Sequence, residues 1–135
     1  MAERHAESPH FIDSPLPPIE VGDWLLKPAT RIAETFSSPS PVADWLVREY
    51  LQVHKSFLLP VRMKLKHRLD FAMTLLSRAM DVQWNEWLKG GMFISIAVVC
   101  CPNRHVPHAC PLRPVSATYS ETIYVQDTTP GETRE

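Results

Sequence analysis

The chain has 135 residues, with 14 Lys and Arg, 15 Asp and Glu, and 13 Pro against 4 Gly. A chain of this length forms one domain at most. Its net charge of −1 excludes a protein that is basic throughout, and its 44% hydrophobic residues exclude a wholly disordered one. Proline makes up about 5% of an average protein, so its excess here predicts that part of the chain lies outside the core.

Targeting signals are missing from the beginning of the sequence. The first 30 residues contain no apolar run of the length that a signal peptide requires. The longest apolar stretch, Met92 to Cys101, is about half as long as a membrane-spanning helix. Three cysteines cannot all pair within one chain, which favours a reducing compartment. We therefore expect an intracellular protein, cytoplasmic or nuclear, with reduced cysteines and no transmembrane segment.

Residues 1–42 form a proline-rich arm in this interpretation. Seven of the 13 prolines lie in the first 41 residues, and each removes an amide donor and restrains the residue before it. The arm is therefore predicted to be extended or disordered, with at most a short helix within Val21–Phe36 that could dock through Trp24. Two kinds of short linear motif occur in it, namely the four Ser-Pro pairs at Ser8, Ser14, Ser38 and Ser40 and the run Pro15-Leu16-Pro17-Pro18. They suggest phosphorylation and recognition by aromatic grooves, and the alternative is a plain spacer.

Residues 43–89 are predicted to form a helical pair. Asp44 is suited to cap a helix. The apolar positions that follow recur at steps of four, three and four residues, at Leu46, Tyr50, Val53 and Phe57. After Pro60, a second helix is expected from Val61 to Leu88, because this segment has no proline or glycine and carries an apolar stripe that includes Trp84 and Trp87. Gly90 and Gly91 would end that helix.

Residues 90–135 have a different character. Met92–Val99 is short, apolar and β-branched, which favours a buried strand. The prolines of Cys101–Pro114 indicate an irregular loop, and Thr118–Gln126 resembles a second strand that could pair with the first. The last nine residues, from Asp127, are polar and would fray. The fold class expected is therefore mainly α, with a helical pair, a proline-rich arm and a small C-terminal β-hairpin.

Potential metal ligands cluster in the predicted loop. Four of them, Cys101, His105, His108 and Cys110, could wrap a zinc ion, although their spacing fits no standard zinc finger. In the alternative interpretation Cys100 and Cys101 are buried at the end of a strand and the histidines are exposed. A cysteine beside histidines could also act as a nucleophile, but no third orienting group can be identified. We therefore expect no enzymatic activity and no cofactor, with zinc as the alternative.

The second predicted helix carries a candidate surface for a partner. Its basic residues are Arg62, Lys64, Lys66 and Arg68, and no acidic residue lies between Glu49 and Asp70. Such a surface could meet a protein or nucleic acid, could be a solvated helix face, or could be covered by the arm, whose first 24 residues hold five acids and one base. The tryptophans Trp84 and Trp87 are candidate interface anchors, although core packing is the commoner role at helical spacing. Self-association through their stripe is a further alternative.

These observations predict a non-enzymatic regulatory or adaptor protein. It would bind another macromolecule through the helical pair, while the arm supplies short linear motifs. The alternative is a zinc-stabilised, nucleic-acid-binding regulatory protein, which would require a bound metal and binding that weakens steeply with salt.

Overall fold

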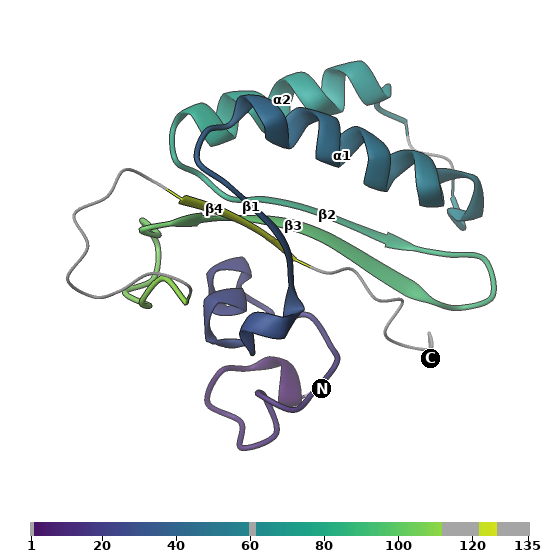
Figure 1. Ribbon diagram of the computed structural model, residues 1–135. Helices are drawn as coiled ribbons and strands as arrows, with labels where there is room; N and C mark the ends of the chain where they lie inside the picture. The colour runs from purple at the N-terminus through teal and green to yellow at the C-terminus, as the bar shows by residue number, and fades with distance from the viewer. Residues whose placement is uncertain (1, 60–61, 112–121, 127–135) are drawn as a thin grey trace.

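The computed structural model describes residues 2–59, 62–111 and 122–126. Its helices are α1 (Ser40–Val53) and α2 (Leu65–Ser77), and its strands are β1 (Ile32–Phe36), β2 (Val82–Trp87), β3 (Phe93–Cys101) and β4 (Thr122–Gln126). Short 3-10 turns occur at Ala2–Arg4, Val21–Leu26, Ala29–Arg31 and His54–Ser56. The strands form one antiparallel sheet in the order β1-β4-β3-β2, and both helices cover the same face of it (Figure 1). Strands β1 and β2 are therefore the two edges.

The expected mainly α fold class is wrong, because helix accounts for 39% and strand for 21% of the structure. The largest difference lies in the second predicted helix, which ends at Ser77 and is followed by the edge strand β2. Ala79 ends the helix in a left-handed conformation with φ of 56°. The amide of Met80 donates to the carbonyl of Leu75 and that of Ala79 to Leu76, as in a Schellman motif. That position normally holds glycine, so with alanine there the sequence does not indicate that the helix ends.

The predicted pairing of the two C-terminal strands is confirmed. Strand β3 pairs with β4 in antiparallel register, with Val98 opposite Val125 and Cys101 opposite Thr122. Residues 118–121 of the predicted second strand and the tail from Asp127 lie outside the described residues. The sheet is larger than a hairpin, because β2 pairs along the other side of β3 and β1 pairs along the other side of β4.

Strand β3 is buried on both faces, which explains its unbroken apolar sequence. Because side chains alternate along a strand, its residues divide between two clusters. Ile96, Val98 and Cys100 pack with the helices around Leu46 and Leu76. Ala97, Val99 and Cys101 pack instead with Trp24 and Leu25 from the N-terminal part of the chain. The sheet thus forms the middle layer of the molecule.

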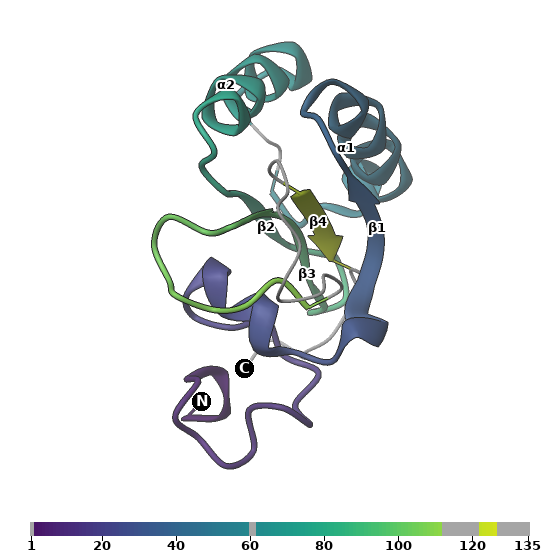
Figure 2. The same ribbon diagram turned by 60° about the vertical axis from the view of Figure 1, so that its left-hand side comes forward.

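The N-terminal segment, residues 2–31, packs against the sheet face opposite the helices (Figure 2). The predicted disordered arm is therefore replaced by a structured layer, and it does not fold back over the basic residues of α2. Cationic side chains explain how a proline-rich segment packs here. Arg4 Nε donates to the carbonyl of Pro17 at 2.8 Å, Lys27 Nζ donates to those of Phe11 and Ser14, and Arg31 donates to those of Ser14 and Pro15. These cations satisfy carbonyl groups that have no regular backbone partner.

Candidate functional site

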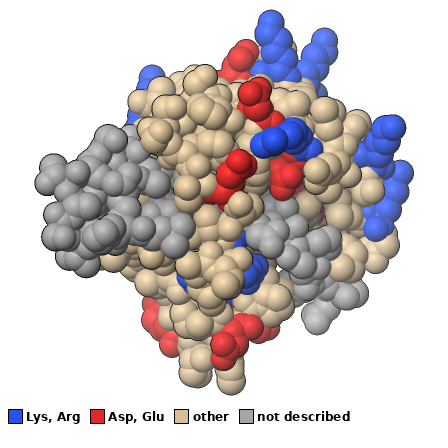
Figure 3. Space-filling model, in the orientation of Figure 1, with Lys and Arg blue, Asp and Glu red and all other residues tan. Residues whose placement is uncertain are grey.

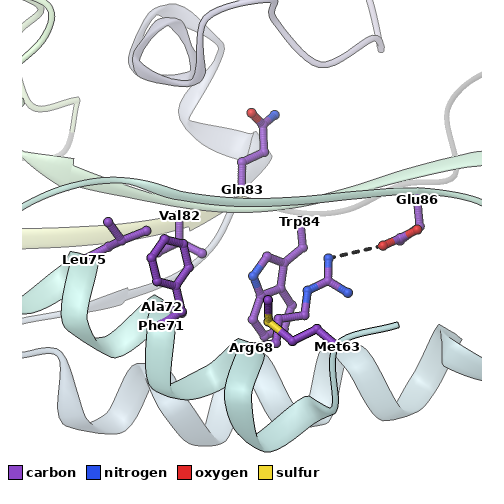
Figure 4. Close-up of a pocket in the computed structure, with 9 residues that line it drawn as sticks. All are labelled: Met63, Arg68, Phe71, Ala72, Leu75, Val82, Gln83, Trp84 and Glu86. Carbon is purple, nitrogen blue, oxygen red and sulfur yellow. Dashed lines mark hydrogen bonds and ion pairs between the residues drawn. The ribbon is translucent and has the colours of Figure 1, made fainter. Parts of the chain in front are cut away.

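A groove with a volume of about 310 Å³ lies between α2 and β2, at the edge of the sheet (Figure 4). It is lined by Met63, Arg68, Phe71, Ala72, Leu75, Val82, Gln83, Trp84 and Glu86. Most of these side chains are apolar, which is the usual character of a binding site.

The base and the rim of the groove differ in exposure. Ala72, Val82 and Trp84 are buried at its base, whereas Phe71 is 61% and Met63 48% exposed at its rim. Every second residue of a strand faces the same side. Val82 and Trp84 therefore both point from β2 toward the helices and form the base of the groove. On α2, positions four apart share a face, so Arg68, Ala72 and Leu75 reach the groove together. The groove is therefore an open apolar surface whose base belongs to the core.

Two charged side chains, Arg68 and Glu86, lie in this apolar lining and pair with each other. The Arg68 guanidinium carbon is 4.6 Å from the centroid of the Trp84 ring, and Nη2 donates to Glu86 Oε1 at 3.2 Å. Only 14% of the Arg68 side chain is exposed. Its Nη1 atom is buried and has no hydrogen-bond partner within the part of the chain that the structure describes. A buried donor without an acceptor is costly, so Nη1 is an unsatisfied polar atom next to the groove.

The backbone of β2 beside the groove is an open sheet edge. The carbonyl of Trp87 faces away from β3, because it accepts from the amide of Leu58 at 2.8 Å. Polar groups alternate between the two sides of an antiparallel strand, so those of Gln83 and Asn85 also face outward. Within residues 2–59, 62–111 and 122–126 no hydrogen bond to these outward backbone groups is observed. An edge of this kind can pair with another chain.

No protein-family model, curated protein or solved structure matches this chain. The candidate site is therefore argued from geometry alone. Within the described part of the chain, neither helix has the length and apolar character needed to cross a membrane.

The residues predicted to bind a partner are divided by the structure. Arg68 and Trp84 line the groove, while Arg62, Lys64 and Lys66 are exposed beside α2. Trp87 packs on Phe93, with ring centroids 5.0 Å apart, and so lies on the opposite face of the sheet from Trp84. In the predicted helix, two tryptophans three residues apart would share one face. In strand β2 the same spacing places them on opposite faces of the sheet.

Sequence reasoning did not identify Met63 and Phe71, which form the rim of the groove. Phe71 lies outside the apolar stripe of Leu65 and Leu69 that faces the core. A large apolar residue outside that stripe, which the structure shows to be exposed, is the sequence signal that indicates an interaction surface here. Phe71 borders a groove only because strand β2 lies beside α2, and the sequence predicts a helix in place of that strand.

The four predicted zinc ligands do not come together. Cys101 and Cys110 form a disulfide with their Cα atoms 5.8 Å apart, contrary to the expectation of reduced cysteines. His108 Nε2 lies 2.8 Å from Asp23 Oδ1, and His105 is exposed. A disulfide sulfur is not a thiolate, and zinc in proteins is bound by thiolates. Among the residues that the structure describes, no group of three or more His, Cys, Asp or Glu side chains is placed to hold a metal ion.

The short linear motifs of the N-terminal segment are partly enclosed. Ser14, Leu16, Pro17 and Pro18 are buried, so the polyproline run packs inside the segment and is not displayed. Ser38 and Ser40 are exposed near the start of α1. Of the serines in the four predicted Ser-Pro pairs, these two are exposed, Ser8 is half-buried and Ser14 is buried.

Proposed function

We propose that this protein is a non-enzymatic regulatory or adaptor module that binds a segment of a partner protein in the groove between α2 and β2. The observation that carries the proposal is an apolar groove beside the part of the β2 edge, at Gln83 and Asn85, to which the described residues make no backbone hydrogen bond. Exposed apolar surface of this kind, bordered by polar residues, is typical of interaction sites. Met63 and Phe71 supply the exposed apolar area, and the outward backbone of Gln83 and Asn85 supplies hydrogen-bonding groups.

The chemistry of the lining favours binding over catalysis. The charged residues among the groove's lining are Arg68 and Glu86, and they pair with each other. The remaining side chains are apolar except for the amide of Gln83, which donates to the Ser95 hydroxyl at 3.3 Å. Such a lining can exclude water and position an apolar side chain of a partner, which is what an interaction site requires.

The alternative, a zinc-stabilised nucleic-acid-binding protein, has less support. Two of its four ligands are joined in a disulfide, and Arg68 is engaged with Glu86 and Trp84. Lys and Arg side chains do protrude over the helical layer, but Asp and Glu side chains lie among them there as well as over the N-terminal segment at the opposite end (Figure 3). Binding of a fluorescent single-stranded or duplex DNA that weakens steeply with salt would favour this alternative.

Selection from a random peptide library displayed on phage tests the proposal. The immobilised wild-type protein is expected to enrich peptides whose binding is lost in Phe71→Lys. The matched control is Leu51→Lys, because Leu51 is 55% exposed on α1 and Phe71 is 61% exposed on α2, but only Phe71 lines the groove. Both variants should keep the wild-type circular dichroism spectrum and melting temperature.

The outcome that contradicts the proposal is equally defined. If no peptide is enriched, or if the enriched peptides bind Phe71→Lys as tightly as Leu51→Lys, the groove is not the binding site. Loss of binding in both variants would also count against it, since Leu51 lies outside the groove.

A further inference from the structure

We infer that the occupant of the groove is an extended, acidic segment of a partner protein that adds to β2 as a fifth strand of the sheet. This inference rests on the proposed function and specifies the partner and its mode of binding. Three features carry it: the open backbone of β2, the apolar lining on one side of that edge, and the basic stripe of α2 above it.

The backbone of β2 defines where the added strand pairs. Gln83 and Asn85 each present one N–H and one C=O outward, as the register with β3 requires. The outward carbonyl of Trp87 is already bonded to the amide of Leu58. The added strand therefore pairs with Val82–Glu86 and ends where the segment that contains Leu58 begins.

The groove defines one face of the added strand. Side chains alternate between the two faces of a strand, so every second residue of the segment points toward α2. The groove that receives them is lined by Phe71, Ala72 and Val82. The central residues of that face are therefore apolar, and their burial supplies the hydrophobic contribution to binding.

The surrounding charges define the ends of that face. Lys64 is the N-cap and Arg78 the C-cap of α2, and each lies seven positions from Phe71, close to two helical turns, so one cation stands at each end of the helix that carries Phe71. Asp70, the one acidic residue of α2, lies about 100° around the helix from Phe71. Beside the stripe, Arg68 Nη1 is buried and lacks an acceptor among the described residues. Acidic side chains at both ends of the groove-facing side complement these cations.

The distances agree with this arrangement. Lys64 and Arg78 flank the 13-residue helix α2 and are 14 positions apart, which corresponds to about 21 Å at the helical rise per residue. Seven residues of extended chain span about 20 Å. A segment with acids at its first and seventh positions, and apolar residues at its third and fifth, therefore matches both the basic stripe and the groove.

A second copy of this chain fits the edge less well. Pairing of two β2 strands about a two-fold axis would bring the same basic α2 stripe from each copy to one interface. Like charges placed opposite one another disfavour association. The occupant is therefore a different, acidic chain.

The experiment uses the strongest peptide from the library selection, synthesised in two N-methylated forms. One form carries N-methyl groups on its odd-numbered amides and the other on its even-numbered amides. Because only one edge of the peptide can pair with β2, one form should lose at least tenfold in affinity while the other binds like the parent. In hydrogen-exchange NMR of the full-length protein, the amides of Gln83 and Asn85 should become at least tenfold more protected when the unmethylated peptide is added.

Charge variants test the acidic character of the occupant. Lys64→Glu should weaken the selected peptide by about tenfold and make its binding less sensitive to salt. Lys66→Glu is the matched control, because Lys66 is an exposed lysine two residues away that does not lie on the stripe of Phe71. The enriched peptides should carry more Asp and Glu than Lys and Arg.

Failure of this inference can be distinguished from failure of the proposed function. If peptides bind in a Phe71-dependent way but both N-methylated forms bind equally, or Gln83 and Asn85 gain no protection, strand addition is wrong and the groove remains the binding site. Concentration-dependent protection of the same two amides without peptide would identify a second copy as the occupant and overturn the inference. Equal effects of the two lysine substitutions would overturn its acidic character.

Discussion

The guanidinium of Arg68 lies over the ring of Trp84, with its central carbon 4.6 Å from the ring centroid, and its Nη2 donates to Glu86 at 3.2 Å. One arginine thus joins α2 to β2 through two different interactions. Because the side chains of Arg68 and Glu86 are 14% and 26% exposed, solvent screens their attraction only in part.

A double-mutant cycle measures this ion pair. Arg68→Met, Glu86→Gln and the double variant should give a coupling free energy of about 1 kcal/mol in chemical denaturation. Arg68→Met alone should cost more than Glu86→Gln, because it also removes the cation–π contact, which contributes about 0.5–1 kcal/mol. Additive single effects would show that the pair does not stabilise the fold.

The disulfide between Cys101 and Cys110 should stabilise the layer below the sheet. The two cysteines are separated by nine positions, and closing a loop of this size contributes about 2–3 kcal/mol in the chain-entropy model. Addition of dithiothreitol should therefore lower the melting temperature of the wild-type protein. The variant with Cys101→Ser and Cys110→Ser should melt at that lower temperature and should not respond to the reductant. A wild-type protein that is equally insensitive would contradict the disulfide.

Lys27 should give the stability a distinctive pH dependence. Burial, together with the nearby Arg31 guanidinium, holds the pKa of the Lys27 ammonium below its ordinary value of 10.5. The folded protein releases this proton at lower pH than the unfolded chain does, so the free energy of unfolding gains a contribution as the pH rises from the lowered pKa toward 10.5.

The comparison that isolates this effect is with Lys27→Met. That variant should be less stable throughout, because the buried carbonyls of Phe11 and Ser14 each lose one hydrogen bond and keep only the longer ones from the Ser14 amide and from Arg31. It should also lack the rise at alkaline pH that wild type shows in denaturant titrations. Parallel curves for the two proteins would mean that the pKa of Lys27 is the same in the folded and unfolded states.

Gly22 should tolerate no side chain unless its neighbour is made smaller. A Cβ atom there would lie 2.7 Å from Cγ2 of Val106 in the loop that follows β3. Gly22→Ala should therefore lower the free energy of unfolding by about 1–2 kcal/mol. Adding Val106→Ala to it should recover part of the loss, which thermal denaturation of the three variants would measure. A double variant less stable than the sum of the single effects would contradict this contact.

The sequence allowed the prediction of those elements whose residues suit only one structure. The β-branched, apolar run before Cys101 favours a buried strand, and the sequence offers Thr118–Gln126 as a strand that could pair with it, of which Thr122–Gln126 does so in the structure. The sequence predicts a helix over Val82–Trp87 because Met80, Trp84 and Leu88 continue the apolar stripe at helical spacing. The deciding event is the left-handed conformation of Ala79, which only the tertiary structure enforces.

The candidate site was predicted only in part for the same reason. Arg68 and Trp84 were selected for charge and size, and both line the groove. Arg68 and Trp84 come together because the chain turns back at Ala79, whereas the predicted helix continues through that position. The proline content of the N-terminal segment predicts disorder, whereas in the structure Arg4, Lys27 and Arg31 donate hydrogen bonds to its carbonyl groups and hold it in place.

The position of β4 between β1 and β3 also determines when the protein can fold during synthesis. Strand β1 forms near the beginning of the chain but has no strand partner until Thr122–Gln126 emerges from the ribosome, about ninety residues later. Until then both β1 and the side of β3 that will pair with β4 present open edges, which are prone to aggregation. A nascent chain that ends before Thr122 therefore exposes one unpaired edge on β1 and another on β3.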